Sequence, residues 1–249
     1  MHVYVYDSFL NQNKYNNTLA KIETRITDLG LNGKICRLGV IKNYQDTILS
    51  EIKRGAKTII AVGNDETINQ IINSVGKFDI PMGIIPIGNE NNLIANALGI
   101  NCDLTACDVL SARRIEKLNL AEANNVFFLS EASITTKNTV IEINKNYSIE
   151  ILEAGEVKII NLPLNKTSLP RNAKFNPQDN KLELYIKTKT SKKFLKKITG
   201  ESVFSFDKLS IENKNHCLII DNSTKLNMPV SINLSNNFIN IIVGKERSF

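Results

Sequence analysis

The chain has 249 residues, of which 42% are hydrophobic and 22% are charged, and its net charge is +6. These are values of a globular protein with room for one large domain or two moderate ones, and the charge is too small to indicate a nucleic-acid-binding protein. Four cysteines without a CxxC pair and only two histidines exclude a zinc site of the usual spacing.

The N-terminal stretch "MHVYVYDSFL" lacks the basic and apolar regions of a signal peptide. No run in the sequence approaches the length of about 18 apolar residues that indicates a membrane-spanning helix. We therefore expect a cytoplasmic protein that contacts a membrane at most peripherally.

Apolar and amphipathic segments alternate over residues 1–115. Continuous apolar strands between amphipathic helices indicate a parallel sheet covered on both faces, so this part is expected to be an α/β domain. In such sheets ligands bind beyond the carboxyl ends of the strands. The expected strands are 2–6, 34–38, 57–63 and 82–88, and the expected helices are 13–30, 43–55, 66–76 and 91–99.

The pattern changes near residue 116, after a helical stretch expected at 107–116. Residues 116–249 are expected to form an antiparallel β domain, a sandwich or a barrel, whose last strand returns toward the cleft between the domains. One short helix is expected at 191–198. The expected strands are 117–123, 125–136, 138–152, 156–163, 181–187, 202–213, 217–221 and 230–244.

The stretch "TIIAVGNDETINQIINSV", residues 58–75, predicts a buried strand, a sharp turn and a helix. Helix N-termini attract phosphate because their first N–H groups are unpaired and the helix dipole favours anions. Glycine lets the backbone approach a phosphate closely. Gly63 and Gly88 end two strands that we expect to be neighbours, so both turns are expected at one edge of the sheet.

These turns resemble those of the diacylglycerol kinase catalytic-domain family, the bacterial lipid kinases related to sphingosine kinases. That family has Gly-Gly-Asp-Gly-Thr after a strand, where this chain has residues 63–67. It then has Pro-x-Gly-Thr-x-Asn-Asp, to which "PIGNENN" is similar, with Pro86, Gly88 and Asn91 kept. Near the C-terminus the family has Asp-Gly-Glu, where this chain has Asp221, Asn222 and Ser223.

The resemblance implies an α/β domain like those of NAD kinases and diacylglycerol kinases, followed by a β-sandwich domain. It also implies an ATP-dependent kinase of lipid hydroxyls that uses magnesium. Asp221 would be the catalytic base that accepts the proton of the lipid hydroxyl. The residues that would bind the nucleotide are Gly63, Asn64, Asp65, Glu66, Thr67, Gly88, Asn89 and Asn91.

Several phosphate-facing positions differ from the family pattern. Asn64 and Glu66 replace glycines, and Glu66 brings a negative charge close to the expected phosphates. We expect Glu66 to act as a capping acid for the helix. Three functions therefore stay open: a lipid kinase with reduced activity, a non-catalytic binding protein of the same fold, and an enzyme similar to NAD kinase. The "PIGNENN" segment favours the lipid branch over NAD kinase.

The segment "KTKTSKKFLKK" concentrates positive charge. Such a run is commonly a solvated face, and the functional alternative is a patch that contacts an anionic membrane. Aside from Phe194, no aromatic side chain lies among these lysines, which disfavours nucleic acid as the partner. The six residues are Lys187, Lys189, Lys192, Lys193, Lys196 and Lys197.

Overall fold

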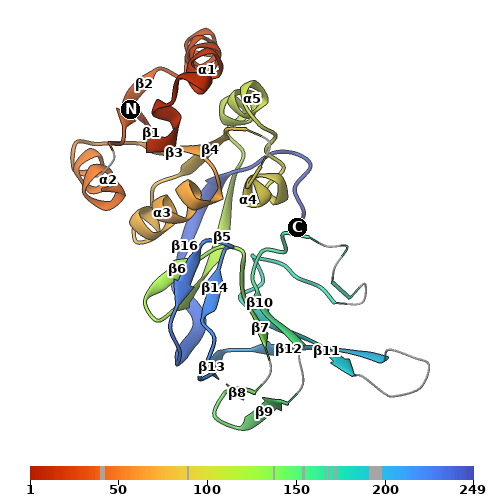
Figure 1. Cartoon of the computed structure of the whole chain (residues 1–249). Helices are drawn as coiled ribbons and strands as arrows, with labels where there is room; N and C mark the ends of the chain where they lie inside the picture. Colours follow the sequence, from red (N-terminus) through yellow and green to blue (C-terminus); the bar gives the residue numbers. More distant parts are fainter. Residues whose placement is uncertain are drawn as a thin grey trace. The chain divides into compact units, whose positions relative to one another are not determined.

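The computed structural model describes residues 1–39, 43–88, 90–136, 138–152, 155–165, 167, 169–170, 173–190 and 198–249. The chain forms two compact units (Figure 1). The first comprises residues 1–118 and 237–248, and the second comprises residues 119–236 and Phe249. In the described part of the chain, no helix combines the length and the apolar character that crossing a bilayer requires.

The first unit contains a parallel sheet with the strand order β2–β1–β3–β4. The last residues of β16 lie parallel to β4, with Ile241 opposite Met82. The strands are β1 (His2–Tyr6), β2 (Gly33–Arg37), β3 (Thr58–Gly63), β4 (Met82–Pro86) and the end of β16 (Val230–Ile242). β3 and β4 are buried along their whole length, as the continuous apolar runs predict.

Helices cover the parallel strands on both sides (Figure 1). Helix α1 packs against α5, and α2 packs against α3. Their apolar positions recur at helical spacing, and in α1 these are Leu19, Ile22 and Ile26, all buried. The helices are α1 (Asn16–Asp28), α2 (Tyr44–Lys53), α3 (Asp65–Val75), α4 (Leu93–Ala97) and α5 (Leu104–Ala112), with short 3₁₀ turns η1 (Ser8–Asn11) and η2 (Asn13–Tyr15).

The second unit is a sandwich of antiparallel strands. One sheet has the order β12–β11–β10–β7–β14–β15, and the other contains β9, β8, β13, the start of β16, β5 and β6. Apolar side chains from both sheets share one core, for example Ile141 and Leu209 with Val157 and Leu184. The bounds are β5 (Ile115–Ala123), β6 (Val126–Phe128), β7 (Glu131–Thr136), β8 (Thr139–Ile143), β9 (Tyr147–Ile151), β10 (Gly155–Ile160), β11 (Leu182–Thr190), β12 (Ile198–Phe206), β13 (Lys208–Glu212), β14 (Leu218–Ile220) and β15 (Thr224–Leu226).

The expected fold class, an α/β part with a parallel sheet followed by an antiparallel β part, is confirmed. The expected helix at 107–116 is wrong in its bounds, because Arg113 adopts a left-handed backbone conformation that ends α5 at Ala112. Ile115 and Glu116 belong to β5 instead. The short helix expected at 191–198 lies outside the described residues, apart from Ile198, which begins β12.

Two glycines allow the C-terminal segment to lie against the end of α4. The N–H of Gly244 donates to the carbonyl of Leu98 at 2.9 Å. A Cβ atom on Gly244 would overlap the carbonyl oxygen of Gly99, so this crossing requires glycine. Ser248 extends the contact by donating to the carbonyl of Ala97 at 2.8 Å.

Candidate functional site

The turn between β3 and α3 is stabilised by a capping box. Asn64 is the N-cap residue, and its side-chain oxygen accepts a hydrogen bond from the N–H of Thr67 at 3.2 Å. In return the Thr67 hydroxyl accepts from the N–H of Asn64, also at 3.2 Å. The capping role expected of Glu66 therefore belongs to Asn64. Glu66 is exposed in the first turn of α3, where the helix dipole favours its charge.

Gly63 is required by packing within this turn. A Cβ atom at position 63 would overlap the hydroxyl oxygen of Thr67, which is fully buried. Asn64 has an extended backbone, with φ −117° and ψ −171°, so the turn needs no left-handed residue at that position. The glycine that the family has there is thus not required by backbone conformation in this chain.

Thr67 also joins the turn to the end of β1. Its hydroxyl donates to Asp7 at 2.7 Å, and the Tyr44 hydroxyl donates to the same carboxylate oxygen at 2.6 Å. The pKa of Tyr44 is raised mainly by burial and, to a smaller extent, by its hydrogen bond to Asp7. The sequence analysis missed Asp7 as a site residue. The sequence feature that could have indicated Asp7 is its place as a polar residue at the carboxyl end of an apolar strand in a parallel sheet.

The second turn lies beside the first. Gly63 pairs with Pro86 in the β3–β4 register, and the N–H of Ile87 donates to the carbonyl of Gly63 at 2.9 Å. Gly88 follows directly and has a φ of +80°, a conformation that favours glycine. The expectation that Gly63 and Gly88 lie at the same edge of the sheet is confirmed.

Asp65 connects the two turns. Its N–H donates to the carbonyl of Asn91 at 2.8 Å, and its carboxylate accepts from the N–H groups of Leu93 at 2.8 Å and Ile94 at 3.1 Å. Asp65 is buried, and its carboxylate caps α4. Asn91 has a φ of 58°, which asparagine tolerates better than most residues. Asn89 lies outside the described residues.

The side chain of Asn92 stabilises the second turn by hydrogen bonding. Asn92 was not predicted from the sequence as a site residue. Its side-chain nitrogen donates to the carbonyl of Gly88 at 2.7 Å, and the thiol of Cys102 donates to the same oxygen at 2.9 Å. Burial raises the pKa of the Cys102 thiol, so the thiol is the stable form.

Asp221 occupies the turn between β14 and β15 and is fully buried. Its carboxylate accepts from the N–H groups of Leu129, Ser130 and Glu131 at 3.3, 3.0 and 3.1 Å, and from the Ser130 hydroxyl. Burial raises its pKa from 3.8 to about 6, although these hydrogen bonds act in the opposite direction. With φ values of 46° and 57°, Asp221 and Asn222 form the left-handed pair of a tight hairpin turn.

The lysine segment is described only at its start. Lys187 forms an ion pair with Glu201 at 2.8 Å across β11 and β12. The side chain of Lys189 and the residues Lys192, Lys193, Lys196 and Lys197 lie outside what the structure describes.

No group of three histidine, cysteine, aspartate or glutamate side chains is arranged to hold a metal within the described residues. At the β3–β4 edge, the Asp65 carboxylate is occupied by α4, whereas the Glu66 carboxylate is exposed. Magnesium in nucleotide sites is commonly held by one or two carboxylates together with phosphate oxygens. Glu66 and Glu90 are exposed acids of these two turns, and neither belongs to a group of three such side chains among the described residues.

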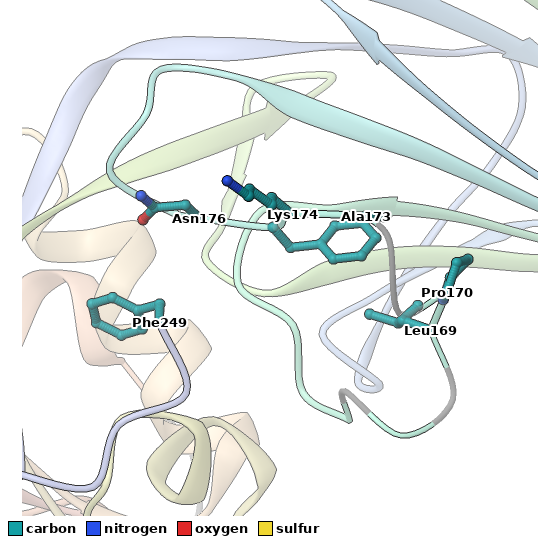
Figure 2. Close-up of a pocket in the computed structure, with 7 residues that line it drawn as sticks. Leu169, Pro170, Ala173, Lys174, Asn176 and Phe249 are labelled. Carbon is teal, nitrogen blue, oxygen red and sulfur yellow. The ribbon is translucent and has the colours of Figure 1, made fainter.

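A hollow of about 440 Å³ lies in the second unit (Figure 2). Its walls are mainly apolar, with the ammonium group of Lys174 and the amide of Asn176 among them. None of the residues predicted for the site lines it. The lining residues are Leu169, Pro170, Ala173, Lys174, Phe175, Asn176 and Phe249.

The architecture is that of known diacylglycerol kinase structures. A crystal structure of a diacylglycerol kinase from Bacillus anthracis str. Sterne superposes with a TM-score of 0.75 at 17% identity, over 98% of this chain and 97% of that one. At this identity the similarity shows the fold alone.

The sequence comparisons match the same family over part of the chain. Residues 4–123, slightly less than half of the chain, match the family model of the diacylglycerol kinase catalytic domain. The resemblance seen in the turn motifs is thereby confirmed. A diacylglycerol kinase of Staphylococcus haemolyticus strain JCSC1435 is 32% identical over 85 residues. The match covers 33% of this chain and 26% of that relative, or about a quarter of its length.

Proposed function

We propose that the chain is an ATP-dependent kinase that phosphorylates a lipid hydroxyl, with the phosphates of ATP bound at the carboxyl edge of β3 and β4. The observation that carries this proposal is the connection through Asp65. Its three hydrogen bonds hold the Gly63 and Gly88 turns together as one surface. A phosphate site shared by two turns needs such a connection, because both turns must keep a fixed distance from the same ligand.

In the proposed reaction the terminal phosphoryl group of ATP passes to the lipid hydroxyl oxygen, and the hydroxyl proton passes to a carboxylate. Asp221 is the candidate for this carboxylate, since a pKa of about 6 leaves it ionised at neutral pH. Magnesium, when bound, supplies positive charge that offsets the negative charge of the phosphates and of the nearby Glu66.

A second candidate function, a non-catalytic binding protein of this fold, is favoured by the surroundings of Asp221. Among the described residues, three backbone N–H groups and the Ser130 hydroxyl donate to its carboxylate, and the side chain is buried. A base must come within hydrogen-bond reach of the substrate hydroxyl, so Asp221 would have to release at least one of these partners.

Calorimetric titration with ATP and magnesium, followed by a phosphorylation assay on vesicles that contain diacylglycerol, tests the proposal. Saturable ATP binding and a phosphorylated lipid product are expected. ATP binding without any lipid product would favour the binding protein. Phosphorylation of NAD in a parallel assay would favour the function similar to NAD kinase, and absence of binding at millimolar ATP would overturn the nucleotide site.

We also propose peripheral contact with an anionic membrane through the lysines of segment 187–197. The ammonium of Lys187 is paired with Glu201, so its charge is partly offset. Co-sedimentation with vesicles that contain anionic lipid, compared with neutral vesicles, measures this contact. Equal sedimentation with both would contradict it.

A further inference from the structure

We infer that Asn64 has two functions in the turn between β3 and α3: its side-chain oxygen caps the helix, and its side-chain nitrogen donates a hydrogen bond to a phosphate of the nucleotide. This inference rests on the proposed function, because it names a ligand-binding group at the same site. It also gives a role to a residue that replaces a glycine of the family motif.

The orientation of the Asn64 amide follows from its partner. A backbone N–H can only donate, so the atom that faces the N–H of Thr67 must be the oxygen of Asn64. The Thr67 hydroxyl is held in turn by Asp7, which keeps the capping box in place. The amide is planar, so the nitrogen of Asn64 is directed away from the capping contact.

The nitrogen of Asn64 has no hydrogen-bond partner among the described residues, and the residue is partly exposed. Three of the backbone N–H groups in this turn are already used within the protein. The N–H of Asn64 donates to Thr67, the N–H of Asp65 to Asn91, and the N–H of Thr67 to Asn64. A glycine-rich turn offers backbone N–H groups to a phosphate. In this turn, the side-chain amide of Asn64 is a further donor.

The neighbouring turn independently indicates a ligand. The side-chain oxygen of Asn92 is buried and has no partner among the described residues, although the nitrogen of the same amide donates to Gly88. A buried acceptor without a donor is costly. A phosphate only accepts hydrogen bonds, so a hydroxyl or amino group of the nucleotide would have to supply this donor. Each turn thus has an asparagine with one polar atom that no described residue satisfies: a partly exposed donor at Asn64 and a buried acceptor at Asn92.

Three variants test the inference. Asn64→Asp keeps the capping oxygen but replaces the donor with a charged acceptor, and Asn64→Ser keeps a cap without adding charge. Gln70→Glu is the matched control, because it makes the same amide-to-carboxylate change at an exposed position of α3 outside the turn. Calorimetry with the magnesium complexes of ATP and of inorganic tripolyphosphate measures binding, and circular dichroism melting measures stability.

We expect Asn64→Asp to weaken binding of both probes by about tenfold or more, and Asn64→Ser to weaken it less, while both variants melt close to the wild type. Gln70→Glu should bind as the wild type does. Unchanged binding in Asn64→Asp would overturn the role of Asn64 and leave the proposed function standing. A wild type that binds tripolyphosphate but not ATP would overturn the nucleotide as the ligand, and one that binds neither would overturn both conclusions.

Discussion

Asp65 and Asp221 are both buried aspartates that follow a strand, and both accept hydrogen bonds from backbone N–H groups far away in the sequence. Their surroundings differ. The partners of Asp65 are the first N–H groups of α4, a helix end that favours negative charge. The partners of Asp221 lie between β6 and β7, and burial dominates there and raises its pKa to about 6. A buried carboxylate can thus cap a helix, as at Asp65, or lie in a hairpin turn where burial raises its pKa, as at Asp221.

The largest expected effect is the loss of Asp221. Asp221→Ala leaves three backbone N–H groups and the Ser130 hydroxyl without their acceptor in the interior. We expect unfolding free energy to fall by about 3–5 kcal/mol at pH 5, measured by urea denaturation. The matched control is Asp207→Ala, at an exposed position, which should change stability by about 0.5 kcal/mol or less. Similar losses in both variants would contradict the structural role of Asp221.

The second largest effect on stability is expected from the titration of Asp221. Its pKa in the folded protein, about 6, lies above the ordinary value of 3.8, so the folded state binds the proton more tightly than the unfolded state. The contribution of this group to stability is therefore full below about pH 4 and is lost as pH rises through 6, by about 3 kcal/mol in total. Asp221→Asn cannot titrate. The difference in unfolding free energy between the wild type and this variant should shrink by that amount from pH 4 to pH 8, and a constant difference would contradict the raised pKa.

Asp65→Ala should have a smaller effect on stability and a local effect on structure. The variant removes the acceptor for the N–H groups of Leu93 and Ile94, which should cost about 1–2 kcal/mol. Hydrogen exchange should become faster in α4 and leave the strands unchanged. Glu90→Ala, at an exposed position of the same turn, is the control and should leave exchange in α4 as it is. Unchanged exchange in both variants would show that Asp65 does not hold the two turns together.

The smallest effect is expected at Glu66, whose charge is exposed in the first turn of α3. Glu66→Gln keeps the helix and removes the charge. If the carboxylate mainly repels the phosphates, magnesium–ATP should bind about two- to fivefold more tightly, and the gain should vanish in high salt. Weaker binding in the variant would show instead that Glu66 holds magnesium. Calorimetry at two salt concentrations separates these outcomes.

The sequence predicted the parts of the fold that depend on local pattern. The apolar runs before Gly63 and Gly88 identified β3 and β4 and placed both turns at one edge. The role of Asp65 was not predictable, because its partners Leu93 and Ile94 follow 28 and 29 residues later and meet it only in the folded chain. Local pattern failed at Arg113, because its left-handed conformation ends a helix without the usual glycine.

The four hydrogen bonds to Asp221 were beyond sequence analysis for the same reason. They join the turn after β14 to residues about 90 positions earlier, and the local sequence pattern gives no information about contacts so far apart in the chain. The resemblance to the family implied that Asp221 is the catalytic base. The structure shows that its carboxylate already accepts hydrogen bonds within the protein, which a catalytic base at this position would have to exchange for the substrate hydroxyl. Asp7 was missed because a single polar residue after a strand is a weak signal without its partners Tyr44 and Thr67.

The path of β16 bears on the order in which the protein can fold during synthesis. Residues 1–118 leave the ribosome first, yet the strand that lies beside β4 in the same unit ends at Ile242. Until that strand arrives, one side of β4 presents unpaired N–H and C=O groups, which invite pairing with other chains. The unit that contains residues 1–118 can therefore complete its sheet only after residues 119–236 of the other unit have been synthesised.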